Sequence, residues 1–479
     1  MYFNRLYFRI LKVFPSELFF LTIAGFFTRF FNLVSNQIVI FDEAHFGLYA
    51  TKYISHQYFF DIHPPLGKML IALSVWIGGV KPGFDFPINV SYGDFPIIAV
   101  RFFPAFFGAL LIPLIYFLMK ELNFSRKVAF LAGFFVLFDN ALLIQSRLAL
   151  LDIIMLFFIF FSLLLFLISI KKKKYSQNWY LTSLICGVFL GFAISVKWIG
   201  IGAIAIIWIY QIYIGDWLTG KYRKNILCSI LFFIIIPLSV YISIFSIHLI
   251  LLNKACDINC GQVLSEGHFL NKTNFIGFNT PPTGNFVQKL FNENEKMAFS
   301  TFLGTSGAHF FQSDWYSWPS MTRPIQYARL NQGEEIKYLY FIGNPLVWWL
   351  SFLGVLGIFY ILFRNYFYKK LKFTPLEFLS NGMGFLIIGY ICFFLFFSII
   401  LRFMFLYHYL TALVFSIMIF SVFINGMLSK ISSKNAKIIY IFILILIFGS
   451  FLFFSPLTYG LPLTEGEYQM RMWLPIWKY

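Results

Sequence analysis

Charged residues are scarce in this sequence. Only 12% of its 479 residues are Asp, Glu, Lys or Arg, whereas a soluble domain has about 25%. Acidic residues are the rarer kind, 20 against 37 Lys and Arg. The sequence also lacks a Walker motif and a Gly-x-Gly-x-x-Gly loop, two common phosphate-binding signatures. These absences exclude a soluble globular protein and argue against transport driven by ATP.

Hydrophobic residues, in contrast, make up 59% of the chain. Many occur in runs of about 20, the length that crosses a hydrocarbon core as an α-helix. We therefore predict an all-α polytopic membrane protein with about eleven transmembrane helices. The first is expected to be a retained signal anchor, because no cleavage site of small residues follows it. The predicted spans are about 17–35, 96–119, 127–143, 150–170, 180–196, 198–214, 226–252, 345–363, 382–400, 408–427 and 437–454.

The basic residues are distributed unevenly about these spans. With the N-terminus in the cytoplasm, twenty of the 37 Lys and Arg residues fall on the cytoplasmic side, but only four of the 20 Asp and Glu residues. This positive-inside pattern explains the formal charge of +17 without nucleic-acid binding. It predicts an N-terminal transmembrane module, an extracytoplasmic loop, a C-terminal transmembrane module and an extracytoplasmic tail. Their boundaries are 1–252, with the first outer loop at 36–95, then 253–344, 345–455 and 456–479.

The five cysteines divide into two groups. Cys186, Cys228 and Cys392 lie in predicted spans, where cysteine behaves as a small apolar residue. Cys256 and Cys260 lie in the second outer loop, at a spacing that could close a small disulfide in an oxidising compartment. A metal-binding pair is the alternative, although no second pair of ligands with suitable spacing stands nearby.

Two adjacent carboxylates mark the start of the first outer loop. It begins IVIFDEAHFG directly after the first span, so Asp42 and Glu43 lie at the membrane boundary among apolar residues. Charged groups are costly there, and a carboxylate in such surroundings can act as a general base. A solvated loop start or a helix N-cap is the alternative interpretation.

A second polar group follows in FFDIHPPLGK, which contains Asp61, His63 and Lys68. The apolar stretch after it has about twelve residues, too few to span the bilayer, and predicts an interfacial or re-entrant helix. The paired prolines fix the entry to this helix, and Lys68 falls in its first turn. The helix could line a groove for a lipid phosphate; surface anchoring alone is the alternative.

Further charges lie at the same predicted face of the membrane. Arg101 begins the second span, Lys197 lies between two spans in SVKWIG, and Arg402 precedes the tenth span. Charges at such positions indicate either a functional site or buried pairing. For Arg101 and Arg402, an anionic ligand and a carboxylate partner are both open. Structural pairing is favoured for the charged residues in the turn between the third and fourth spans, Asp139, Arg147 and Asp152.

The second outer loop ends in a segment that combines polar and aromatic side chains. His309, Gln312 and Arg323 are hydrogen-bond donors, and Trp315 and Trp318 offer faces on which sugars commonly stack. An aromatic belt at the membrane interface is the competing explanation for the tryptophans. The polar residues between them favour a binding surface.

Taken in order, these segments resemble the protein O-mannosyltransferase family, a branch of the polytopic GT-C glycosyltransferases. The series runs from about 40 to 475, and its order carries the specificity. The resemblance implies a GT-C fold with about eleven transmembrane helices and extracytoplasmic loops. The segments that carry it are FDEAHFG (41–47), FFDIHPPLGK (59–68), FDNALLIQSRLALLD (138–152), SVKWIG (195–200), HFFQSDWYSWP (309–319), IGNP (342–345) and FLYHYL (405–410).

The resemblance implies an enzyme that transfers mannose from a lipid phosphate carrier to a Ser or Thr hydroxyl, with inversion at the anomeric carbon. The family's catalytic Asp-Glu pair falls on Asp42 and Glu43, with Asp42 as the base. The lipid phosphate that leaves needs cationic or hydrogen-bonding partners. No cofactor is required, because the lipid-linked sugar is a substrate, and the sequence leaves a metal ion open. The predicted substrate-binding residues are Asp61, His63, Lys68, Arg101, Lys197, His309, Gln312, Arg323 and Arg402.

One departure from the family's pattern narrows the expected type of enzyme. Eukaryotic members carry a β-trefoil MIR domain in the loop that corresponds to 253–344, which is too short for it here. The sequence therefore looks like a bacterial-type enzyme of the plasma membrane, with polyprenyl-phosphate-mannose as donor and Sec-exported proteins as acceptors. Its other partners are membrane lipids, not nucleic acid. A related GT-C transferase acting on a glycolipid or wall polymer is one alternative. A transporter is another, although it would place charges nearer the bilayer midplane.

Overall fold

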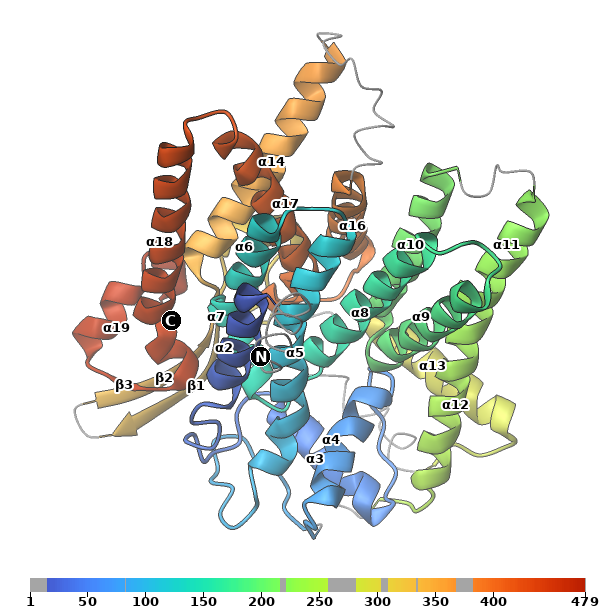
Figure 1. Ribbon diagram of the computed structural model, residues 1–479. Helices are drawn as coiled ribbons and strands as arrows, with labels where there is room; N and C mark the ends of the chain where they lie inside the picture. The colour runs from blue at the N-terminus through green and yellow to red at the C-terminus, as the bar shows by residue number, and fades with distance from the viewer. Residues whose placement is uncertain are drawn as a thin grey trace, which may run out of the picture.

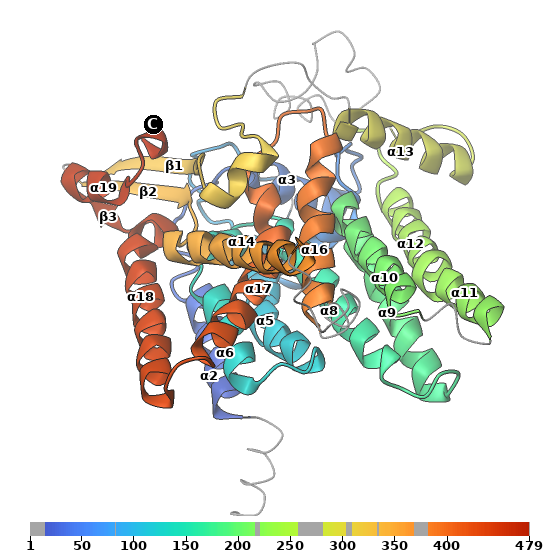
Figure 2. The same ribbon diagram turned by 90° about the horizontal axis from the view of Figure 1, so that it is seen from above.

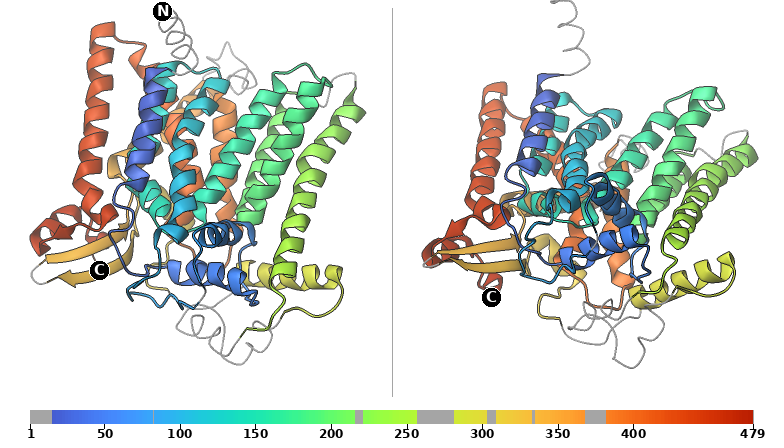
Figure 3. Two further views of the ribbon diagram at one scale, coloured as in Figure 1. Left: turned by 60° about the horizontal axis from the view of Figure 1, so that its bottom comes forward. Right: turned by 90° about the horizontal axis from the view of Figure 1, so that it is seen from below.

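The chain forms a bundle of long helices with a small sheet and several short helices at one end (Figure 1). The computed structural model describes residues 15–81, 83–215, 221–256, 281–302, 309–332, 335–367 and 382–478. Figure 3 shows the short helices and strands at the end of the bundle away from the start of α2 (Ser16–Phe30).

Each predicted span corresponds to one helix or to two consecutive helices. Helices α5, α8 and α17 are central and mostly buried, whereas α18 and the α11–α12 unit lie at the periphery. The helices are α2 (Ser16–Phe30), α5 (Ile98–Glu121), α6 (Arg126–Leu137), α7 (Asn140–Arg147), α8 (Asp152–Ile170), α9 (Gln177–Val196), α10 (Ile201–Tyr213), α11 (Tyr222–Ile230), α12 (Ile236–Leu251), α14 (Pro345–Phe367), α16 (Met383–Leu395), α17 (Leu410–Leu428) and α18 (Ser433–Tyr459).

The structure confirms a polytopic helical fold but not the count of eleven spans. Among the described residues, seven helices are long and apolar enough to cross a membrane, or up to eight if α6 and α7 form one span. These two helices meet at an angle of 57°. The break falls at Asp139, whose carboxylate accepts a hydrogen bond from the backbone N–H of Leu142 at 2.9 Å and so caps α7.

Close helix approach depends on small residues, as is usual in membranes. At Gly108 in α5, an added Cβ would lie only 2.2 Å from Oγ of Ser146 in α7. A larger residue at this position would therefore push the two helices apart. Helix α7 leads directly into the turn that precedes α8 and Asp152.

Three short helices and a sheet form the end of the bundle opposite the start of α2. They are α3 (Glu43–Ser55), α4 (Leu66–Ile77) and α13 (Phe286–Phe302). Helix α4 is the short apolar helix expected after the paired prolines. The sheet was not expected; it is antiparallel in the order β1 (Ile325–Gln332), β2 (Glu335–Phe341), β3 (Pro462–Leu463). Figure 2 shows it with α19 (Glu465–Arg471) on one side of the molecule and α13 on the other.

The described cysteines lie where the sequence predicted them to lie. Cys186, Cys228 and Cys392 are free and lie on the bundle helices. Cys256 is disulfide-bonded. Its predicted partner, Cys260, lies outside the described residues, so the pairing of these two stays a prediction.

Candidate functional site

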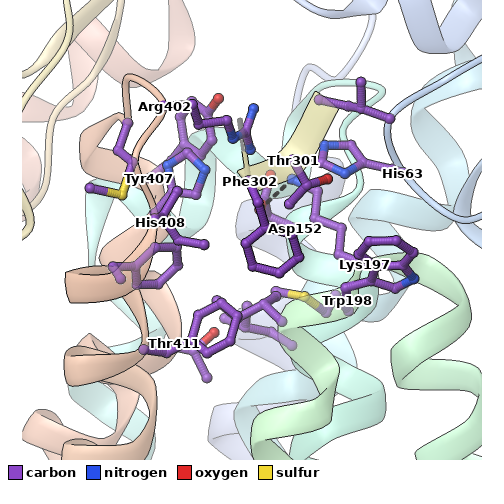
Figure 4. A pocket seen from close by; sticks show the side chains of 18 residues that line it. His63, Asp152, Lys197, Trp198, Thr301, Phe302, Arg402, Tyr407, His408 and Thr411 are labelled. Atoms are coloured by element: carbon purple, nitrogen blue, oxygen red, sulfur yellow. Dashed lines mark hydrogen bonds and ion pairs between the residues drawn. The ribbon is translucent and has the colours of Figure 1, made fainter. Parts of the chain in front are cut away.

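A pocket lies where several bundle helices end or begin (Figure 4). Asp152 begins α8, Lys197 follows α9, and Thr301 and Phe302 end α13. The opposite wall comes from the segment between α16 and α17, which carries Arg402. Five chain segments that are distant in sequence thus supply one cavity. Its other polar or aromatic lining residues are His63, Trp198, Phe396, Phe397, Tyr407, His408 and Thr411.

An ion pair crosses the floor of this pocket. Nζ of Lys197 lies 2.8 Å from Oδ1 of Asp152, and each side chain is about one tenth exposed. The two residues meet because α8 and α9 are antiparallel neighbours, so the start of one lies beside the end of the other. Nζ of Lys197 also lies 5.6 Å from the ring centre of Tyr407. Pairing was expected for Asp152, but its partner could not be named from the sequence.

Arg402 lines the same pocket but differs from Lys197 in its hydrogen-bond and ion-pair partners. Its Nε is buried without a hydrogen-bond partner, and its guanidinium is in no ion pair with any carboxylate that the structure describes. Burial lowers the pKa of this guanidinium, while Tyr407 and Asp61 act to raise it. A desolvated cation with an unused donor is the arrangement that an anionic ligand would complete.

His63 is held in the pocket by the loop that precedes α4. Nζ of Lys68 forms an ion pair with Asp61 and donates a hydrogen bond to the carbonyl oxygen of His63 at 2.6 Å. Lys68 is buried, so this pair fixes the loop rather than facing a ligand. Burial holds the pKa of His63 well below its usual range, and Lys197 and Arg402 lower it further. Positive charge therefore converges on the place where His63 points (Figure 4).

Asp42 is not among the lining residues of the pocket, but its charge acts on Tyr407, which is one of them. The preceding residue, Phe41, has a φ of 52°, a left-handed conformation that is uncommon for a bulky residue and often marks functional sites. Its ring stacks on Tyr327 at 4.2 Å and contacts Tyr407 edge-on at 6.4 Å. Burial raises the pKa of Tyr327, and Tyr407, Asp42 and Asp152 raise it further. Asp42 is partly exposed at the N-terminus of α3.

Glu43 is in wholly different surroundings. It is fully buried and forms a two-pronged pair with Arg101, Oε1 to Nε at 2.7 Å and Oε2 to Nη2 at 2.8 Å. It also accepts hydrogen bonds from the backbone N–H groups of Ile40 and Ala149. Arg101 directs its remaining donors at carbonyl oxygens near the end of α2, including that of Leu33. This pair ties the first outer loop to α5 and leaves Arg101 no donor for a phosphate.

The remaining predicted residues lie next to the pocket rather than in it. The ring of His309 packs on Phe403 and Phe405, with ring centres 5.7 and 4.9 Å apart. Oε1 of Gln312 accepts a hydrogen bond from the backbone N–H of His309 at 3.0 Å. Arg323 donates to the carbonyl oxygen of Phe310 at 2.9 Å. Of these three residues, His309 packs directly against the segment that carries Arg402.

The aromatic lining differs from the one expected. Trp318 is fully buried and stacks on His408 at 6.0 Å, so it cannot offer a face to a sugar. Trp198, Phe302 and Tyr407 face the pocket in its place. Two of these, Trp198 and Tyr407, belong to segments that the sequence had already singled out, SVKWIG and FLYHYL. Phe302 carried no such signal, because it ends an ordinary amphipathic helix.

Within the described ranges, no three His, Cys, Asp or Glu residues gather in a way that could hold a metal ion.

Two family models match most of the chain. One, described as dolichyl-phosphate-mannose-protein mannosyltransferase, matches residues 19–253. The other, described as the C-terminal four TMM region of protein-O-mannosyltransferase, matches residues 286–477. The chain is also 37% identical over 245 residues to dolichyl-phosphate-mannose-protein mannosyltransferase 6 of Saccharomyces cerevisiae. That alignment covers 49% of this chain but only 32% of the yeast protein, so about a third of that relative's length is matched.

Solved structures resemble the fold as a whole. The Saccharomyces cerevisiae protein O-mannosyltransferase Pmt1-Pmt2 complex bound to the sugar donor gives a TM-score of 0.84 at 19% identity, over 97% of this chain and 92% of that chain. The oligosaccharyltransferase AglB of Archaeoglobus fulgidus, in complex with an inhibitory peptide and a dolichol-phosphate, gives 0.57 at 15% identity, over 94% and 56%. At these identities the likeness shows the fold, which is the GT-C fold expected from the sequence.

Proposed function

Because the chain belongs to the protein O-mannosyltransferase family, we propose that it transfers mannose from polyprenyl-phosphate-mannose to Ser or Thr hydroxyls of exported proteins. The relatives named above are mannosyltransferases that use dolichyl-phosphate-mannose, which supports a lipid-phosphate donor of the same kind. We propose a plasma-membrane location with the pocket on the extracytoplasmic side, as the distribution of basic residues favours.

The observation that carries this proposal is the unpaired state of Arg402. A lipid phosphate in the pocket would supply the anion that the guanidinium lacks, while Lys197 shares its charge between Asp152 and the phosphate. Neutral His63 adds a hydrogen-bonding group on the same side. The apolar part of the lining, which includes Met155, suits the first isoprene units of the carrier.

The proposed reaction is a single displacement at the anomeric carbon. Asp42 accepts the proton of the acceptor hydroxyl, the hydroxyl oxygen bonds to C1 of mannose, and the bond from C1 to the phosphate oxygen breaks. The carrier leaves as polyprenyl phosphate, and Arg402 and Lys197 stabilise the charge that it gains. Glu43 does not touch substrate in this scheme; with Arg101 it positions the start of α3 and thereby Asp42.

Membranes that contain the protein can test the proposal with radiolabelled polyprenyl-phosphate-mannose and a Ser/Thr peptide. The parent protein should label the peptide, and Asp42→Asn should reduce turnover by about 10²- to 10⁴-fold, the usual worth of general-base catalysis. Asp85→Asn is the matched control, because Asp85 lies exposed in the same outer loop. The proposal fails if the parent labels no peptide, or if Asp42→Asn and Asp85→Asn retain equal turnover at saturating substrates.

A further inference from the structure

The hydroxyl of Tyr407 is a pocket group that the proposed reaction leaves unused. We propose that this hydroxyl donates a hydrogen bond to a hydroxyl of the transferred sugar, which makes Tyr407 a specificity-determining residue. The inference rests on the proposed function and deepens it, because it assigns the sugar a place between Asp42 and Arg402.

The Tyr407 hydroxyl is available to a ligand. The residue lines the pocket and is partly exposed, and its hydroxyl forms no hydrogen bond with any group in the described ranges. Two nearby tyrosines differ in this respect. Nε2 of Gln145 donates to the hydroxyl of Tyr327 at 2.8 Å, and the hydroxyls of Tyr409 and Tyr390 lie 3.5 Å apart. A phenol hydroxyl can donate one hydrogen bond, and that of Tyr407 is unused.

The charges around Tyr407 place it between the two ends of the proposed reaction. Asp42, Asp152 and Arg402 all act on it electrostatically. Figure 4 shows Tyr407 and Arg402 on one wall of the pocket and His63 on the other. In an inverting displacement the attacking and leaving oxygens lie on opposite sides of the anomeric carbon. The sugar must therefore lie between the base Asp42 and the cation Arg402, which is where Tyr407 stands.

The ring of Tyr407 is held in place by its neighbours. The ring centres of Phe405 and His408 lie 5.5 and 4.6 Å from its own, and Phe41 contacts it edge-on at 6.4 Å. Nζ of Lys197 lies 5.6 Å from the ring centre. Because these groups surround the ring, the contact expected with a sugar is a hydrogen bond to the hydroxyl rather than stacking on the ring. A hydroxyl held in this way loses little entropy when a ligand binds.

A sugar hydroxyl is the ligand group that suits this donor. The cations Arg402 and Lys197 already serve the phosphate end of the donor, whereas the uncharged sugar needs neutral hydrogen-bonding partners. A site that hydrogen-bonds a substrate hydroxyl discriminates against analogues that lack it. Tyr407 therefore helps to select the sugar, and the lipid carrier is held by other groups.

Donors that lack one sugar hydroxyl test the inference. Tyr407→Phe keeps the ring and should lower kcat/KM for polyprenyl-phosphate-mannose by about three- to tenfold, the worth of one neutral hydrogen bond. Among the four monodeoxy forms of this donor, the one that lacks the contacted hydroxyl should be used equally by parent and variant. No loss with mannose, or the same loss with mannose and all four deoxy donors, overturns the inference and leaves the proposed function intact. If the parent transfers no mannose, both fail.

The product carrier separates the sugar from the phosphate. Polyprenyl phosphate has the phosphate but no sugar, so Tyr407→Phe should leave its inhibition constant unchanged. Arg402→Ala should raise that constant, because it removes the proposed phosphate contact. If Tyr407→Phe weakens inhibition by polyprenyl phosphate as much as Arg402→Ala does, the hydroxyl binds the phosphate and the assignment to the sugar is wrong.

Tyr409→Phe is the matched control in the same segment. The Tyr409 hydroxyl lies near that of Tyr390, its ring packs on Trp348 with centres 5.3 Å apart, and the residue does not line the pocket. This change should leave the preference for mannose over each deoxy donor as it is in the parent. The same change of preference in Tyr407→Phe and Tyr409→Phe contradicts a direct contact between Tyr407 and the sugar.

Discussion

At the residue scale, Asp42 and Glu43 show how adjacent carboxylates can differ in role. The backbone turns Glu43 inward onto Arg101 and two backbone N–H groups, while Asp42 stays partly exposed beside the pocket. Removing one partner of a buried pair leaves an uncompensated charge, which is far more costly than losing an exposed carboxylate. Replacing Glu43 should therefore reduce the stability of the protein far more than replacing Asp42.

The first prediction concerns this buried pair. Glu43→Ala should destabilise the folded protein by about 3–5 kcal/mol, because Arg101 would remain buried without its carboxylate. Thermal unfolding in detergent measures the effect, and Asp42→Ala serves as the matched control with a small change. Equal melting temperatures for the two variants would show that the pair does not hold the loop.

The second prediction separates Arg402 from Arg323. Arg402 lines the pocket, whereas Arg323 donates to a carbonyl oxygen outside its lining. A charge-assisted hydrogen bond is worth about 1.5–3 kcal/mol, so Arg402→Ala should raise the donor KM by about 10- to 100-fold. Arg323→Ala should change it much less. Titration of each variant with polyprenyl-phosphate-mannose checks this, and the reverse order would move the phosphate site to the 309–323 segment.

The third prediction is the pH dependence that follows from His63. Its folded pKa lies well below the ordinary value of 6.5, so the unfolded chain binds a proton below about pH 6.5 that the folded protein does not. Stability should therefore fall as the pH drops from 7.5 to 5.5, by about 1 kcal/mol for this group. His63→Gln should lose correspondingly less than the parent over this range. Parallel stability curves for the two proteins would contradict a neutral, buried His63.

At the scale of elements, polar contacts hold helix α13 in place, and the end of this helix forms one wall of the pocket. The hydroxyl of Tyr58 donates to Oε1 of buried Glu293 at 2.5 Å. At the adjacent residue of α13, Asn294 accepts a hydrogen bond from the hydroxyl of Tyr241, which itself accepts one from Nε1 of Trp198. The helix ends at Phe302, which lines the pocket. Contacts at the middle of α13 thus determine the position of a pocket wall.

The fourth prediction tests this coupling. Tyr58→Phe removes the hydroxyl and leaves Glu293 buried without its donor, so amide exchange across 286–302 should increase. The donor KM should rise severalfold with little change in turnover at saturation. Tyr316→Phe is the control, because Tyr316 is 65% exposed. An unchanged exchange rate in α13 would show that other contacts hold this wall.

At the scale of the whole molecule, the fifth prediction concerns orientation. Reporters fused after Lys174 or Lys437 should be cytoplasmic, and one inserted within 262–300 should be external, because positive charge gathers at the first two positions. An external reporter at Lys174 would reverse the proposed sidedness of the pocket.

Mass spectrometry of the non-reduced protein should also find Cys256 linked to Cys260.

The sequence alone determined the class of the protein and the places where helices run. Hydrophobic runs and turn residues act locally, so every predicted span contains one helix or two consecutive helices, and Asp42 and Glu43 follow the first span at the start of α3. The same local signals predicted the short helix after Pro65. It could not fix the number of spans, because helix bends such as that at Asp139 depend on neighbouring helices.

Only the tertiary structure decided how the charges pair and what lines the pocket. Arg101 binds a carboxylate 58 residues away, and Lys197 binds one 45 residues away. The sheet likewise joins 325–341 to 462–463. The worth of a buried charge depends on which groups surround it after desolvation, and those groups come from distant segments. The sequence could therefore supply the charged residues of the site, but only packing separated the unpaired Arg402 from the cations that hold the fold.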